Sequence, residues 1–184
     1  NDFFNEKLIP YKISNNGPGF AKGDINNDGF DDFFIGNASE KQPHVYINNG
    51  KTIKEINFPE IIKDSIFEDT CAAFIDIDND NDLDLYVGSG LHSIRMNSFE
   101  QDRLYINEKG TFKRTENVFK NTNNTSCIKP YDYDNDGDID IFIGNRSNPS
   151  DFGSKVKSYL LKNDGQGNFN PDTNFSLESK VTDA

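Results

Sequence analysis

Short apolar runs alternate with acidic, asparagine-rich turns along most of the chain. The runs are four to five residues long, carry β-branched or aromatic side chains, and are bounded by Asp, Asn and Gly, as at Phe33–Gly36 and Leu85–Gly88. Such runs are typical of strands, because an amphipathic helix needs a longer stretch with a period of about 3.6 residues. The pattern predicts a nearly all-β chain in which only Pro59–Phe67 favours a helical turn or two.

One nine-residue acidic loop occurs three times. The loops begin at Asp24, Asp76 and Asp132, so the repeat is 52 and then 56 residues long. Each loop runs into an apolar stretch that ends in Gly, and a second apolar run then leads to a turn such as Asn49-Gly50 or Asp164-Gly165. Asn-Gly and Asp-Gly favour tight hairpins because both residues tolerate a positive φ. Each repeat therefore predicts four strands, which is the anatomy of a β-propeller blade.

The predicted fold class is all-β, with about three four-stranded antiparallel blades. We expect residues 1–184 to form a single propeller segment with repeat units at 18–58, 70–120 and 125–175, the tail of a preceding blade at 1–17 and the start of a following blade at 180–184. The stretches Ser89–Asp102 and Asn145–Lys157 are predicted as loops on one face. Closed propellers usually have about four to eight blades, so three blades predict a part of a larger propeller.

Three blades would also leave two apolar sheet faces uncovered. Each blade of a propeller buries its faces against its neighbours, and uncovered apolar faces associate. We therefore expect self-association through the open blade faces. Light scattering that found a compact monomer at all concentrations would contradict this expectation.

Oxygen-bearing side chains occupy positions 1, 3, 5 and 9 of each acidic loop. Calcium takes six to eight oxygen ligands, and these positions converge only if a residue near the middle turns sharply, as Gly29, Asn81 and Gly137 can at position 6. The backbone carbonyl of position 7 would add a further ligand. The predicted metal ligands are Asp24, Asn26, Asp28, Phe30 and Asp32; Asp76, Asp78, Asp80, Asp82 and Asp84; and Asp132, Asp134, Asp136, Asp138 and Asp140.

These loops have three competing interpretations. An EF-hand needs a carboxylate at position 12, where this chain has Ile35, Val87 and Ile143. Magnesium is disfavoured because its octahedral shell retains several waters, whereas each loop supplies four side chains. Acidic turns that bind no metal remain an alternative, which becomes less probable when three loops share one pattern.

The loop pattern carries a family resemblance. Asp-x-(Asp/Asn)-x-Asp-(Gly/Asn)-x-x-Asp-x-x-x-Gly, present three times, resembles the FG-GAP/VCBS repeats of integrin α-subunit-type β-propellers, and Arg103–Asn107 and Lys162–Phe169 resemble the same repeat in bacterial surface and secreted proteins. The resemblance implies calcium between the first two strands of each blade, about three ions in all, and an extracellular, cell-surface or periplasmic location. Asn26 in place of an acid and Asn81 in place of Gly depart from the pattern.

The charge of the chain excludes two classes of binding partner. Lys and Arg number 19 and Asp and Glu 31, a formal net charge of −12, which repels nucleic acid and anionic lipid alike. No stretch approaches the roughly 20 apolar residues of a membrane span.

Cys71 and Cys127 take equivalent positions five residues before a loop and are expected to be free thiols, with a disulfide as the alternative. The histidines, His44 and His92, have no Ser or Cys partner at a recognisable spacing, so no catalytic site is predicted.

The leading interpretation is a calcium-binding propeller segment that acts in adhesion, ligand binding or scaffolding, with a protein or glycan ligand on a loop face. One alternative is a lectin-like glycan-binding module, although the chain has no Trp for sugar stacking. The other is a non-catalytic part of a polysaccharide-degrading enzyme. The heavy use of Asn, Lys and Ile is typical of a low-GC bacterial genome.

Overall fold

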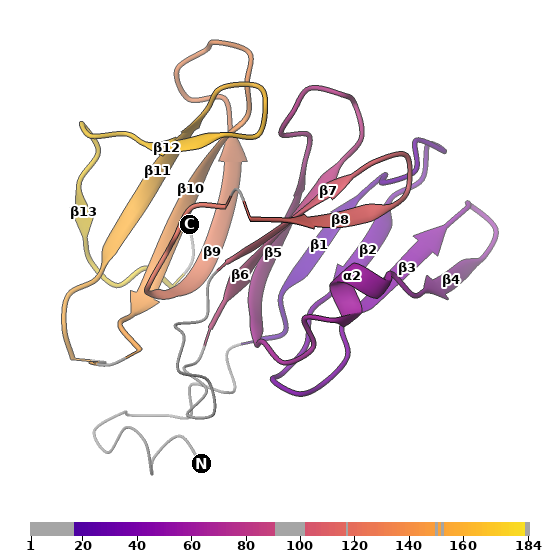
Figure 1. Ribbon diagram of the computed structural model, residues 1–184, viewed down its shortest axis with the longest axis horizontal. Helices are drawn as coiled ribbons and strands as arrows, with labels where there is room; N and C mark the ends of the chain where they lie inside the picture. The colour runs from indigo at the N-terminus through magenta and orange to yellow at the C-terminus, as the bar shows by residue number, and fades with distance from the viewer. Residues whose placement is uncertain (1–16, 91–101, 117, 150, 152, 183–184) are drawn as a thin grey trace.

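The computed structural model describes residues 17–90, 102–116, 118–149, 151 and 153–182. Three antiparallel sheets stand side by side like the blades of a fan, and the chain passes from one sheet to the next in sequence order (Figure 1). The first sheet contains β1 (Phe20–Gly23), β2 (Asp32–Ile35), β3 (His44–Asn48) and β4 (Ile53–Ile56) in that order. The second contains β5 (Asp69–Ile75), β6 (Asp84–Ser89), β7 (Arg103–Asn107) and β8 (Phe112–Thr115).

The third sheet has the same order with one strand more. It contains β9 (Asn124–Tyr131), β10 (Asp140–Ser147), β11 (Lys157–Asn163) and β12 (Phe169–Pro171), and β13 (Leu177–Glu178) pairs with the other end of β11. The α2 helix (Pro59–Ile62) links the first two sheets. No helix among the described residues is long and apolar enough to cross a membrane.

These elements confirm the predicted all-β class, the four strands of each repeat and the helical turn after Pro59. The loop predicted at Asn145–Lys157 is wrong at its start, because β10 continues to Ser147. Polar side chains keep this end of the strand paired: Asn145 N donates to Ser158 Oγ at 3.0 Å and Asn124 Nδ2 donates to Ser147 Oγ at 2.9 Å. Most of the other predicted loop, at 91–101, lies outside the described residues, as do His92 and residues 1–16 of the predicted blade tail.

Two apolar layers lie between the sheets. The first sheet places Phe34 and Val45 against Leu85 and Val87 of the second, and Ile61 from α2 joins this cluster. The opposite face of the second sheet turns its own buried side chains toward the third sheet. That second cluster contains Ile75, Ile77, Tyr86, Leu104, Ile128, Ile141, Ile143 and Leu161. Successive side chains of a strand point to opposite faces of its sheet, so alternate residues of the second sheet belong to two different apolar clusters.

The first strands of neighbouring sheets, β1, β5 and β9, pack against one another. Hydroxyl groups at equivalent positions of β5 and β9 bond to the segment that follows: Thr70 Oγ1 on β5 donates to Thr125 O on β9 at 2.5 Å, and Ser126 Oγ on β9 donates to Val181 O at 2.6 Å. Cys71 and Cys127 lie on these strands as free thiols, as expected. The structure thus has propeller-like blades. Their apolar faces pack against each other, and their first strands lie in contact.

A buried ion pair within the second blade lies at its boundary with the first. Arg103 Nη2 on β7 donates to Asp69 Oδ1 at 2.5 Å, and their side chains are only 2 % and 1 % exposed. Asn37 N, which follows the first sheet, donates to Asp69 Oδ2 at 3.0 Å. The Arg103 guanidinium also lies 4.7 Å from the centre of the Phe67 ring. A carboxylate of the second blade thus receives hydrogen bonds from both blades.

Candidate metal centres

All three acidic loops lie along one edge of the molecule, between the first and second strands of each blade (Figure 1). Their backbones follow the same path, because positions 4 and 6 take left-handed conformations. The φ values are 58°, 60° and 60° at Asn27, Asn79 and Asn135, and 90°, 70° and 98° at Gly29, Asn81 and Gly137. Asn and Gly are the residues that adopt this region at least cost. The sharp turn predicted at position 6 is therefore present in each loop.

The carboxylate at position 1 of the first and third loops accepts hydrogen bonds from the backbone of positions 5 and 6. In the first loop, Asp24 accepts hydrogen bonds from Asp28 N at 3.1 Å and Gly29 N at 2.7 Å. In the third loop, Asp132 accepts from Asp136 N and Gly137 N at 3.2 and 3.1 Å. These bonds draw the following carboxylates toward position 1.

The aspartate at position 9 starts the second strand of each blade and is fully buried. Asp84 accepts from Ile77 N at 3.1 Å and from Asn107 N at 2.8 Å, so it connects the loop to the end of the third strand. Asp32 and Asp140 make the same pair of bonds in their blades. Each oxygen of these carboxylates retains a further lone pair for another partner.

Burial raises the pKa of the aspartate at position 9. It raises the pKa of the Asp84 carboxyl to about 7, mainly through desolvation, while the two backbone N–H donors oppose the shift. Desolvation likewise raises the pKa of Asp32, Asp140 and Asp78 from the ordinary value of 3.8. A bound cation would oppose these shifts, because a nearby positive charge favours the ionised carboxylate.

Carboxylate oxygens converge in two of the loops. Asp76, Asp78 and Asp84 can place oxygens within 4.8 Å of one another, and Asp132, Asp134 and Asp136 can do the same. The residues described in the first loop form no such group of three acids, because Asn26 stands at position 3. The structure thus contains two acidic clusters that could hold a metal, in the second and third loops.

The second loop contains the clearest sign of a missing partner. Oδ1 of Asp76 and Oδ1 of Asp78 are buried and accept no hydrogen bond. A buried oxygen without a partner costs free energy, which coordination of a cation would recover. Hard oxygen donors on alternate loop positions suit calcium, so the residues of this loop fit the ion that the sequence predicts.

Neighbouring loops are joined through position 4. Asn27 Nδ2 donates to Asp82 Oδ1 at 2.8 Å, and Asn79 Nδ2 donates to Asp138 Oδ1 at 2.7 Å. Asp82 and Asp138 stand at position 7, whose side chain was not a predicted ligand, and the structure uses it to bind the preceding loop. The sequence analysis missed this role, although all three loops have Asn at position 4.

A second asparagine, at the end of the third strand, also reaches the preceding loop. Asn107 Nδ2 donates to Ile25 O at 2.9 Å, and Asn163 Nδ2 donates to Ile77 O at 2.7 Å. The first and second loops are thus held in place by the blade that follows them. This role was also missed, and the recurring Asn before each hairpin turn was the available signal.

The third loop has a different neighbour. Lys162 Nζ lies 3.0 Å from Asp134 Oδ2, so a cation already faces this cluster. In the first loop, position 7 is Phe30, whose ring covers Gly50 in the hairpin turn. His44, the histidine within the described residues, lies 2.7 Å from Glu55 Oε1 on the neighbouring strand.

Comparison with known proteins agrees with this geometry. No curated protein gave a significant match to the chain. The family model of the FG-GAP-like repeat matches residues 24–87, a range that includes the first two acidic loops and the blade boundary between them. Residues 24–87 are therefore identified as an FG-GAP-like repeat.

Proposed function

We propose that this chain is a calcium-binding propeller segment of an extracellular or surface protein, with one Ca²⁺ in each acidic loop. The observation that carries the proposal is the pair of buried, partnerless oxygens of Asp76 and Asp78 inside a carboxylate cluster. The predicted ligands Asp24, Asn26, Asp28, Asp32 and their counterparts would hold the ions, and the carbonyls of Phe30, Asp82 and Asp138 would complete the shells. The ions would neutralise carboxylates that otherwise repel one another.

A titration of the second loop tests the ligand assignment. Asp78→Asn retains an oxygen but removes the charge, and we expect it to weaken one calcium-binding event by about tenfold or more, the effect of losing a charge-assisted contact. Asp31→Asn makes the same charge change at an exposed acid that pairs with Lys22 and is not a proposed ligand. Isothermal titration calorimetry should show three binding events in Asp31→Asn. Equal calcium affinities in the two variants would refute the assignment.

The first loop should bind calcium most weakly of the three. It offers three carboxylates where the others offer four, because Asn26 stands at position 3, and each lost charge reduces the attraction for a divalent cation. Asn26→Asp should therefore raise the affinity of the weakest event in the titration while leaving the other two unchanged. A first loop that is already the tightest site would contradict this ranking.

The hydrogen bonds between loops predict a measurable link between blades. Asn79→Gly keeps the left-handed backbone but removes the bond to Asp138, and should lower the free energy of unfolding by about 1 kcal/mol. Asn135→Gly is the matched control, because Asn135 has the same φ but its side chain makes no hydrogen bond to a described residue. Urea unfolding in calcium measures the difference. Equal losses in both variants would mean that the bond adds nothing.

Adhesion, ligand binding or scaffolding is the role that we propose for the segment, with a protein or glycan ligand on a loop face. FG-GAP repeats are typical of extracellular or surface proteins, which supports this setting. The lectin-like module and the non-catalytic part of a polysaccharide-degrading enzyme stay alternatives. A glycan array with the calcium-loaded protein would distinguish a lectin from a protein-binding module.

Membership of a larger propeller is part of the same proposal. Val181 N donates to Asn145 O at 2.9 Å, as Asp69 N donates to Asn37 O at the start of β5. This contact of Val181 supports the prediction that a following blade starts at residues 180–184. On the opposite side, Phe20 is 55 % exposed and stacks on Phe33, which supports the predicted association through open sheet faces.

A further inference from the structure

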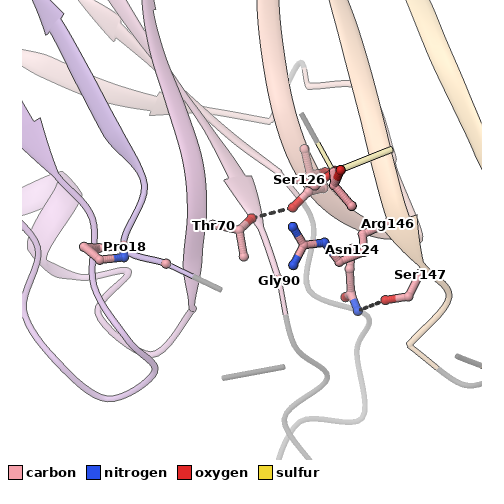
Figure 2. A pocket seen from close by; sticks show the side chains of 10 residues that line it. Pro18, Thr70, Gly90, Asn124, Ser126, Arg146 and Ser147 are labelled. Carbon is pink, nitrogen blue, oxygen red and sulfur yellow. Dashed lines mark hydrogen bonds between the residues drawn. The ribbon is translucent and has the colours of Figure 1, made fainter. Parts of the chain in front are cut away.

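A polar cavity lies at the end of the blades opposite the acidic loops. It has a volume of about 290 Å³ and opens where the first strands of the three sheets begin. Its lining includes Pro18 before β1, Thr70 at the start of β5, and Asn124 and Ser126 at the start of β9 (Figure 2). Three blades therefore contribute to one cavity.

Arg146 gives this cavity its chemistry. The side chain leaves β10 and extends its guanidinium into the space between Thr70 and Asn124 (Figure 2). Its Nε is buried and has no acceptor, and Arg146 makes no hydrogen bond or ion pair with a described residue. By contrast, Arg103 and Arg114 are paired with Asp69 and Asp64. A partly buried guanidinium without an anion is costly to maintain, and an oxyanion is its natural partner.

The described lining residues offer Arg146 no counter-charge. Apart from Arg146 itself all of them are neutral, and the side chains of three of them already donate hydrogen bonds. Thr70 Oγ1 donates to the main-chain oxygen of Thr125 and Ser126 Oγ to that of Val181, and Asn124 Nδ2 donates to Ser147 Oγ. The cavity is thus lined by polar side chains that are already hydrogen-bonded and by one guanidinium, that of Arg146, which has no acceptor among the described residues.

Distance isolates this cation from the acidic loops. Thr70 lies near the start of β5 and Asp76 directly follows its end, so six residues at about 3.3 Å each separate them by about 20 Å. The Debye length is about 8 Å at physiological ionic strength, so solvent largely screens the loop charges at the cavity. An anion can therefore approach this end of a protein whose net charge is −12.

The repeat scaffold does not require an arginine at this position. Counted from the start of each acidic loop, Ala38 and Gly90 occupy the place that Arg146 occupies in the third repeat. Gly90 lines the cavity, and a Cβ there would come within 2.2 Å of Thr70 Cγ2. A small residue in the second blade and a long cationic residue in the third together create the cavity and its charge.

We propose that this cavity binds an oxyanion, the carboxylate or sulfate group of a small ligand, through the Arg146 guanidinium. The planar fork of N–H donors matches the geometry of such groups, and bonds of this kind are charge-assisted. The volume is close to the lower limit for small-molecule pockets, about 300 Å³, which suits a ligand the size of a single sugar ring or a simple acid.

The test is a titration of the calcium-loaded chain, observed by NMR on the backbone amides, with sulfate and with glucuronate. Chloride at equal ionic strength is the comparison for a simple anion that is not an oxyanion, and glucose is the uncharged comparison for ring shape. Arg146→Gln removes the cation, Arg146→Lys keeps the charge but loses the fork, and Lys54→Gln on the exposed strand β4 makes the same charge change elsewhere. We expect saturable shifts at Thr70, Ser126 and Arg146, and a loss of affinity of about tenfold or more in Arg146→Gln but not in Lys54→Gln.

The two anions distinguish the source of the oxyanion. Saturation by glucuronate but not glucose assigns a carboxylate ligand, and saturation by sulfate assigns a sulfate ester or free sulfate. Either result supports the site, provided that Arg146→Gln weakens it and Arg146→Lys falls between. The proposal is overturned if neither anion gives saturable shifts at the cavity, or if Arg146→Gln binds as the unmodified chain does.

Discussion

Chelation of calcium is expected to lower the melting temperature of this protein by about 10–30 °C. A ligand that binds only the folded state stabilises it by about 1.4–2.7 kcal/mol when its free concentration is about ten to a hundred times Kd. Three sites would therefore contribute about 4–8 kcal/mol, and in a domain of this size each kcal/mol shifts the midpoint by about 2–4 °C. The calcium contribution of about 4–8 kcal/mol is a large fraction of the unfolding free energy of a typical domain, which is about 5–15 kcal/mol.

The chelation experiment has internal controls. Differential scanning calorimetry with EGTA should show the full loss, restoration of calcium should reverse it, and the same concentration of magnesium should restore little of it. Asp78→Asn should melt at an intermediate temperature in calcium and coincide more closely with the unmodified chain in EGTA. A melt that chelator leaves unchanged would exclude structural calcium.

Strand positions were predictable from the sequence because each depends on local chemistry. Phe33–Ile35 and Leu85–Val87 are short apolar runs closed by glycine, and they form β2 and β6 with one residue of difference at their starts. The paths of the acidic loops followed from Asn and Gly at the left-handed positions. The end of β10 was not predictable, because Asn145 and Ser147 continue the strand through side-chain bonds to Ser158 and Asn124.

The links between blades could not be read from the sequence, although their residues recur. Asn79 meets Asp138 across 59 residues, and Asn163 meets Ile77 across 86. Such contacts depend on how one sheet packs on the next, which the pattern within a repeat does not specify. The cavity around Arg146 has the same origin, since it requires three blades to meet.

The buried pair of Arg103 and Asp69 joins β7 and β5 of the second blade across 34 residues, and its loss should have the second large effect. Desolvation raises the pKa of Asp69, and the adjacent Arg103 guanidinium is the main influence that opposes the rise. Arg103→Met would leave a carboxylate buried without its cation. Removal of one partner of a buried pair typically costs about 3–5 kcal/mol of unfolding free energy.

The pH dependence of Arg103→Met should identify the cause. Without the guanidinium, the pKa of Asp69 in the folded state rises further above its value in the unfolded chain, so the folded state holds the proton more tightly. Stability should then fall as the pH rises above the unfolded pKa, because the ionised carboxylate is the form that the fold disfavours. The unmodified chain should lose less over the same range.

A second substitution separates the stranded charge from the loss of packing against Phe67. Asn in place of Asp69 can still accept the hydrogen bond from Asn37 N, but it carries no charge to strand. Asp69→Asn combined with Arg103→Met should therefore recover part of the lost stability and remove the added pH dependence, since neutral replacements of a buried pair are often tolerated. Urea unfolding at pH 5 and pH 8 measures both effects. If the double variant were no more stable than Arg103→Met at pH 8, the cost would come from packing around Phe67 and not from the uncompensated carboxylate.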